Sequence, residues 1–213
     1  MDWNKAMEPL ISKYRGKAHP LAYQNRYQLL VMVLLSAQDS DRHINQIAPD
    51  FFSAFPTMTH LAKANEGQLY PLLNTVRNFE NKTKWLMKLA PMVGNDDAIP
   101  RTLIELTKLS GIGRKSANVI LRESGLPAEG IIVDLHVVRV APRLGIAVGE
   151  NPEKIENQLM GVLDRSTWGE AGMAISFLGR ETCRPTNPNC PVCVMNAVCE
   201  YGSTTLSGSS SKV

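Results

Sequence analysis

The cysteines constrain the fold of this chain more than any other feature, because all four lie in one short segment. Cys183, Cys190, Cys193 and Cys199 fall within 17 of the 213 residues, at the spacing C-x6-C-x2-C-x5-C. Proline, asparagine and small apolar residues separate them, which suits a tight loop wrapped around an inorganic centre. The structure of this segment therefore depends on what the four sulfur atoms bind.

Three kinds of bonding are open to these cysteines. Disulfides are disfavoured because the N-terminus has no apolar leader and the longest apolar run, residues 29–35, is too short to span a bilayer. We therefore expect a soluble, cytoplasmic protein with reduced thiols. Zinc sites usually pair two C-x2-C hairpins, and here only Cys190 and Cys193 are so spaced. An iron–sulfur cluster tolerates uneven spacing, so the spacing alone leaves zinc and a cluster open.

Composition is ordinary for a globular protein, with 44% hydrophobic and 20% charged residues. The net charge of +3 does not by itself indicate nucleic-acid binding. The distribution of charge along the chain is more informative. Residues 101–143 carry seven Lys or Arg against four Asp or Glu, so this stretch alone has a net charge of +3.

Hydrophobic periodicity predicts helices along most of the chain, and therefore an all-α fold. Prolines predict a kink or break at Pro49 and an early helix end at Pro91. Only residues 130–134 resemble a strand, and one short strand cannot build a sheet. The Ser/Gly-rich residues 202–213 are expected to form a flexible tail. The predicted helices cover residues 2–14, 27–37, 39–55, 66–73, 81–92, 102–109, 114–124, 134–144, 152–163 and 167–179.

The stretch LSGIGRKSANVILRESG predicts a helix-hairpin-helix. Gly111 and Gly113 permit positive φ in the turn and leave backbone N–H groups uncovered. Arg114 stands at the start of the second helix, where the helix dipole favours an anion. A DNA phosphate is the natural occupant, and such a contact supplies affinity without reading bases.

Four segments, in this order and at these separations, resemble the endonuclease III family of helix-hairpin-helix DNA glycosylases and AP lyases. They are LLSAQDSD, LSGIGRKSANVIL, VDLHVVRV and the cysteine segment, and the resemblance runs from about residue 20 to 201. It implies a [4Fe–4S] cluster in place of zinc. It also implies two helical domains with a DNA-binding cleft between them: a six-helix barrel at 20–129, with the hairpin at about 102–124, and a cluster domain formed by 1–19 and 130–201.

The family's catalytic pair corresponds to Lys115 and Asp134. A neutral lysine amine can attack the sugar C1′ and form a Schiff base, and a helix N-terminus, Arg114 and partial burial would lower its pKa. A carboxylate can stabilise positive charge that develops on the sugar. Two simpler interpretations stay open: Lys115 as a phosphate contact, and Asp134 as an N-cap of the helix that follows it.

The resemblance also implies DNA contacts. Gln38 would enter the space left by an extruded base, and His136 would contact the distorted strand. Their alternatives are a polar residue at a helix end and a surface histidine. Three positions depart from the family pattern. Ser110 stands where the family usually has a proline, and Leu135 stands where it often has a threonine. Asn78 stands where a large apolar wedge is usual.

Together these features predict a bifunctional enzyme that removes oxidised pyrimidines from double-stranded DNA and nicks the strand by β-elimination. We expect a monomer that acts on nucleoid DNA, on damaged bases or abasic sites, with no membrane partner. The alternatives are a non-catalytic helix-hairpin-helix DNA-binding module and a glycosylase of the same superfamily with another base specificity. A covalent borohydride trap would separate the enzyme from the module.

Overall fold

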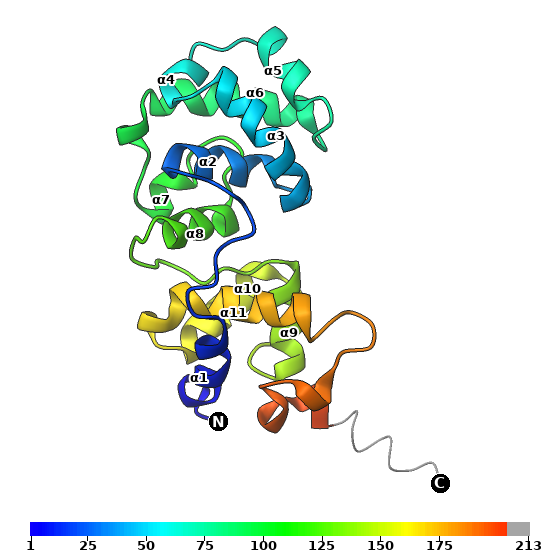
Figure 1. The fold of residues 1–213 in the computed structure, drawn as a ribbon. Helices are drawn as coiled ribbons and strands as arrows, with labels where there is room; N and C mark the ends of the chain where they lie inside the picture. The colour runs from blue at the N-terminus through cyan, green and yellow to red at the C-terminus, as the bar shows by residue number, and fades with distance from the viewer. Residues whose placement is uncertain (204–213) are drawn as a thin grey trace. The chain divides into compact units, whose positions relative to one another are not determined.

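The computed structural model describes residues 1–203, and every regular element within them is a helix, as Figure 1 shows. The predicted all-α fold is confirmed. Residues 131–134 form no strand and lead directly into a helix. No helix in the described part is long and apolar enough to cross a membrane. The α-helices are α1 (Trp3–Tyr14), α2 (Arg26–Leu35), α3 (Asp41–Ala54), α4 (Met58–Leu61), α5 (Glu66–Leu73), α6 (Phe79–Val93), α7 (Leu103–Leu106), α8 (Arg114–Glu123), α9 (Leu135–Leu144), α10 (Pro152–Val162) and α11 (Trp168–Glu181).

The chain divides into two compact units. Residues 18–126 form the middle unit, which contains α2 to α8. Residues 1–17 and residues 127–203 form the terminal unit, so segments from the beginning and the end of the described part share one unit. The predicted tail begins at residue 202, and residues 204–213 of it lie outside the described part.

Helix α2 is the buried centre of the middle unit. Asn25 caps its N-terminus by accepting a hydrogen bond from the Gln28 N–H, and residues 29–35 are all buried. Helices α3, α6 and α8 pack against it. The Tyr27 hydroxyl donates to the Phe55 carbonyl oxygen over 2.7 Å, which ties α2 to the end of α3. The apolar run of the sequence thus becomes a core helix.

Neither Pro49 nor Pro91 breaks its helix. Helix α3 continues through Pro49, and α6 continues through Pro91 to Val93. A proline inside a helix costs about 3 kcal/mol. In α3, the buried residues Ile44, Ala48 and Phe51 hold the helix against the core on both sides of Pro49, and this packing outweighs that cost. Pro91 lies in the last turn of α6, where the helix would end in any case.

In the terminal unit, α11 packs against α1 and α9. The approach to α9 depends on glycines that leave room for it. A Cβ on Gly172 would lie 2.3 Å from the Ile132 carbonyl oxygen, and one on Gly179 would lie 2.9 Å from the His136 Cβ. Neither distance is possible for a real side chain, so α11 can lie this close to the start of α9 only because these positions lack one.

We predict that Gly172→Ala lowers the free energy of unfolding by about 1–3 kcal/mol, because the added methyl meets backbone. The matched control is Gly161→Ala in α10, where an added Cβ meets nothing within 4 Å. That substitution should raise stability by up to about 1 kcal/mol, since alanine is the better helix former. Urea unfolding measures both. Equal effects of the two substitutions would contradict the close packing of α11.

Candidate functional site

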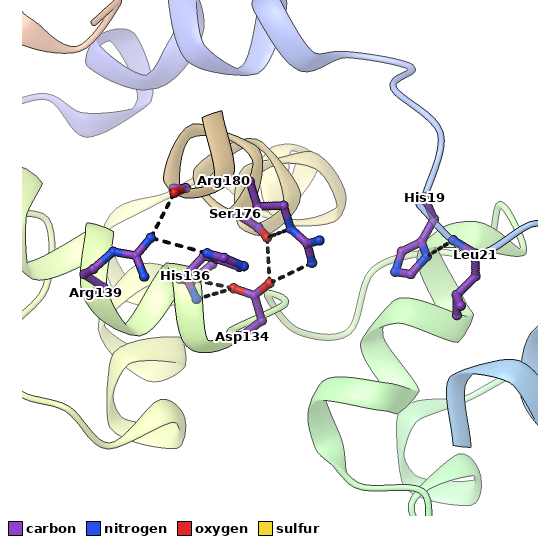
Figure 2. Close-up of polar contacts among 9 residues, drawn as sticks. His19, Leu21, Asp134, His136, Arg139, Ser176 and Arg180 are labelled. Carbon is purple, nitrogen blue, oxygen red and sulfur yellow. Dashed lines mark hydrogen bonds and ion pairs between the residues drawn. The ribbon is translucent and has the colours of Figure 1, made fainter. Parts of the chain in front are cut away.

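Asp134 makes contacts through both of its carboxylate oxygens (Figure 2). It is the N-cap of α9, where its Oδ1 accepts hydrogen bonds from the His136 and Val137 N–H groups, both at 2.9 Å. Its Oδ2 accepts from the Ser176 Oγ at 2.6 Å and lies 3.7 Å from an Arg180 nitrogen. The side chain is 11% exposed. The N-cap interpretation therefore holds, and the carboxylate is fixed in one orientation.

The partners of Asp134 share one face of α11. Gly172, Ser176 and Arg180 are spaced four residues apart, so they follow one another along that face. Gly172 permits the close approach, Ser176 supplies the hydrogen bond, and Arg180 supplies the opposite charge. The sequence analysis missed Ser176 and Arg180, although their spacing from the glycine was a usable signal.

His136 is held as a neutral imidazole. An Arg139 nitrogen lies 3.3 Å from its Nδ1, and because a guanidinium only donates, Nδ1 accepts and the ring proton lies on Nε2. Burial lowers the pKa of His136. The nearby charge of Asp134 opposes this effect, whereas those of Arg180 and Arg139 add to it. The net direction is downward from the ordinary value, which favours the neutral ring at neutral pH.

Two arginines connect α9 to the cysteine segment. Arg139 donates to the carbonyl oxygens of Gly179, at 2.9 Å, and Cys183, at 3.2 Å. Arg143, one turn later, donates to the Arg184 carbonyl oxygen at 2.8 Å, and one of its nitrogens lies 3.6 Å from the Cys183 Sγ. The helix capped by Asp134 thus also anchors the loop that begins at Cys183.

The four cysteines line one pocket of about 320 Å³ in the terminal unit. None of them forms a disulfide, so this alternative has no support in the structure. Burial raises the pKa values of Cys193 and Cys199, and the negative charges of neighbouring thiolates raise them further. Within residues 1–203, no three His, Cys, Asp or Glu side chains converge closely enough to hold a single metal ion.

The predicted hairpin lies in the middle unit, between α7 and α8. Helix α7 ends at Leu106, earlier than predicted, because the chain turns toward Gly111. Gly111 has φ +81°, and a Cβ there would meet the Trp85 ring at 2.8 Å. Gly113 differs from the prediction: its φ is −87°, in extended backbone, and it serves as the N-cap of α8. Only the first glycine therefore needs positive φ.

Arg114 and Lys115 are the first two residues of α8. Both therefore stand at the positive end of the helix dipole, as predicted. Lys115 is exposed, so the expected partial burial is wrong for this structure.

Gln38 and Asn78 share an unusual backbone conformation. Their φ angles are +59° and +61°, in the left-handed region. Gln38 follows the end of α2, and Asn78 is the N-cap of α6. Both side chains are exposed. Asparagine tolerates this conformation better than a large apolar residue, which gives a backbone reason for Asn78 at the position.

The predicted set is divided between the two units. The middle unit holds the hairpin residues Gly111, Gly113, Arg114 and Lys115 together with Gln38 and Asn78. The terminal unit holds Asp134, His136 and the four cysteines, and it joins them through α9.

A family model matches residues 31–165, that of the HhH-GPD superfamily base excision DNA repair proteins. The chain belongs to this superfamily. The match covers well over half of the chain and includes the hairpin and Asp134, so the resemblance seen in the sequence is confirmed.

Relatives of this superfamily match over nearly the whole chain. Endonuclease III of Rickettsia conorii is 33% identical over 93% of this chain and 95% of its own length. Endonuclease III of Synechocystis is 32% identical over 87% of this chain and 86% of its own length. The chain therefore spans nearly the full length of these relatives.

Solved structures also match the fold of this chain. A trapped endonuclease III–DNA covalent intermediate has a TM-score of 0.84 and 28% identity, with 95% of this chain and 96% of that chain covered. A thermostable thymine-DNA glycosylase has a TM-score of 0.81 at 17% identity, covering 96% of this chain and 100% of that chain, which shows the shared fold.

We predict that His136 titrates below its ordinary pKa of about 6.5. Because the unfolded chain then binds the proton more readily, His136 contributes stability that is present above pH 6.5 and is lost as the pH falls through its folded pKa. NMR titration of the ring carbons measures the pKa, and His136→Asn assigns the signal. A value at or above 6.5 would contradict the neutral, half-buried ring.

Proposed function

We propose that this protein is a bifunctional DNA glycosylase and AP lyase that acts on oxidised pyrimidines in double-stranded DNA. One observation carries the proposal. Lys115 stands at the start of α8, in a chain that aligns over 95% of its length with an endonuclease III trapped covalently on DNA. A covalent intermediate needs a nucleophile, and a lysine amine beside a phosphate-binding turn is suited to that task.

Lys115 is the proposed nucleophile. Its neutral amine attacks the sugar C1′, and the damaged base leaves with the electron pair of the glycosidic bond. Ring opening and loss of a proton from nitrogen give the Schiff base. Removal of a C2′ proton then expels the 3′ phosphate and nicks the strand. The helix dipole and the adjacent Arg114 lower the pKa of its amine, and bound DNA adds desolvation that favours the neutral form.

Asp134 is the proposed electrostatic partner. Two backbone N–H groups and Ser176 already hold its carboxylate, so its charge needs no rearrangement during the reaction. A fixed charge of this kind stabilises positive charge that develops on the sugar as the base departs. The N-cap and the catalytic role are therefore compatible, because the first creates the rigidity that the second uses.

The proposed DNA contacts lie on both units. The hairpin turn at Gly111 and Gly113, with Arg114, grips phosphates without reading sequence. Gln38 and Asn78 enter the duplex when a base is extruded. His136 donates from Nε2 to the distorted strand, a role that its neutral tautomer allows. We propose that the protein acts as a monomer on damaged bases and abasic sites in nucleoid DNA.

We propose that Cys183, Cys190, Cys193 and Cys199 hold a [4Fe–4S] cluster. All four line one pocket, so the structure brings their side chains to the same place. A [4Fe–4S] cluster takes one thiolate on each of its four irons, and the number of cysteines matches this requirement. When bound, the cluster would supply a rigid cross-link for the loop that Arg139 and Arg143 join to α9.

We expect Lys115→Gln to abolish borohydride trapping on abasic DNA while duplex binding, measured by gel shift, stays largely intact. The amide cannot form a Schiff base. The matched control is Lys88→Gln, which removes an exposed lysine from a helix of the middle unit. Trapping by Lys115→Gln at the parent rate would show that another amine is the nucleophile, and no trapping by the parent would favour a non-catalytic DNA-binding module.

Asp134→Asn should slow base excision by about 10²-fold or more, because the neutral amide cannot stabilise a developing cation. Cleavage at preformed abasic sites should fall much less, since no glycosidic bond remains to be broken. Single-turnover rates on thymine glycol and on abasic duplexes measure the two steps. Equal losses on both substrates would indicate that Asp134 acts only as a helix cap.

The purified protein should be brown and contain about four irons per chain. Cys199→Ser should lower the soluble yield, because Cys199 is the most buried of the four cysteines and ligation is coupled to folding. Iron analysis and visible absorbance measure the cluster. A colourless protein with one zinc after anaerobic preparation would contradict the assignment.

A further inference from the structure

Gln38 and Asn78 lie in separate segments of the middle unit, and both are held in a left-handed backbone conformation. For residues other than glycine this conformation costs about 1–3 kcal/mol and persists only where neighbouring contacts enforce it. The contacts around these two residues therefore show what fixes them.

Asp39, the residue after Gln38, supplies the first of these contacts. Its Oδ2 accepts a hydrogen bond from the N–H of Arg77, the residue before Asn78, at 2.8 Å. Its Oδ1 accepts from the Ser40 N–H at 2.7 Å and from the His43 Nδ1 at 2.9 Å. One carboxylate thus joins the two segments directly.

The His43 ring extends this connection. Because an ionised carboxylate only accepts hydrogen bonds, Nδ1 donates to Asp39, and Nε2 lies 3.2 Å from the Thr75 Oγ1. The Asp39 side chain is 10% exposed. Burial alone would raise its pKa, but the hydrogen bonds from Arg77, His43 and Ser40 outweigh this effect and hold the pKa below its ordinary value.

Lys82 makes a second connection between the same two segments. Its side chain is 1% exposed, and its Nζ donates to the Leu35 carbonyl oxygen at 2.7 Å. Lys82 lies in the first turns of α6, just after Asn78, and Leu35 is the last residue of α2, just before Gln38. Each segment is therefore tied to the other on both sides of its left-handed residue.

We propose that Asp39 is a positioning residue that sets the separation of the Gln38 and Asn78 side chains for insertion into the duplex. This inference rests on the proposed function, because insertion matters only to an enzyme that extrudes a base. Preorganised groups avoid the ordering cost at the moment of binding, and a small misplacement lowers reaction rates strongly.

Three variants test the role of Asp39. Asp39→Ala removes the tie to Arg77 and His43. Asp39→Asn keeps one oxygen for the Arg77 N–H and can donate to the other His43 tautomer, so it should restore part of the loss. Asp96→Ala is the matched control, because the Asp96 carboxylate accepts from the Met58 N–H at 2.7 Å in the same unit but does not contact Gln38 or Asn78.

The first measurement is single-turnover cleavage. Asp39→Ala should slow base removal from a thymine glycol duplex by about tenfold or more. Its β-elimination on a single-stranded abasic oligonucleotide should stay at the parent rate, because no stack has to be entered. Asp39→Asn should lie between, and Asp96→Ala should match the parent on both substrates. Thermal unfolding verifies that all three variants are folded at the assay temperature.

The second measurement reports insertion itself. A duplex with a tetrahydrofuran abasic analogue opposite 2-aminopurine brightens when a bound protein unstacks that base. At saturating protein, Asp39→Ala should give a smaller rise than the parent and Asp96→Ala an equal one. A rise equal to the parent's, with equal cleavage rates, would overturn the positioning role. Failure of the parent to cleave or trap abasic DNA would overturn the proposed function instead.

Discussion

The close contact between α11 and the residues that lead into α9 is the constraint on which the terminal unit depends. Without side chains at Gly172 and Gly179, the two segments approach at distances that exclude a Cβ. Ser176 can then reach Asp134 over 2.6 Å, and Arg139 can reach the Gly179 carbonyl oxygen. The packing of two helices therefore decides the orientation of the carboxylate, because a hydrogen bond of this length forms only when both backbones are held close together.

In each unit an aspartate near a helix end joins two separate segments. One of its oxygens accepts from the backbone of its own segment, and the other accepts from a second segment. Asp134 joins α9 to α11, and Asp39 joins the end of α2 to the start of α6. A charged acceptor forms stronger hydrogen bonds than a neutral one, so few contacts are enough to fix a short segment.

Helix α9 connects Asp134 to the cysteine segment within the terminal unit. Its N-terminus is capped by Asp134, and its later turns place Arg139 and Arg143 against the carbonyl oxygens of the cysteine segment. Folding of the cysteine loop and placement of the carboxylate are thus linked by one rigid helix. The proposed cluster, by holding this loop, would also support the placement of Asp134.

The sequence by itself determined the helical fold, the superfamily and the approximate place of each major helix, because periodicity, caps and motif spacing are local properties of the chain. The catalytic and DNA-contacting roles of Lys115, Asp134, Gln38 and Asn78 remain predictions. Only the tertiary structure decided that α3 passes through Pro49, that Lys115 is exposed and that Ser176 and Asp39 hold the residues beside them. The contacts of Ser176 and Asp39 join segments about 40 residues apart, and no local pattern records which distant backbone will lie within hydrogen-bonding reach.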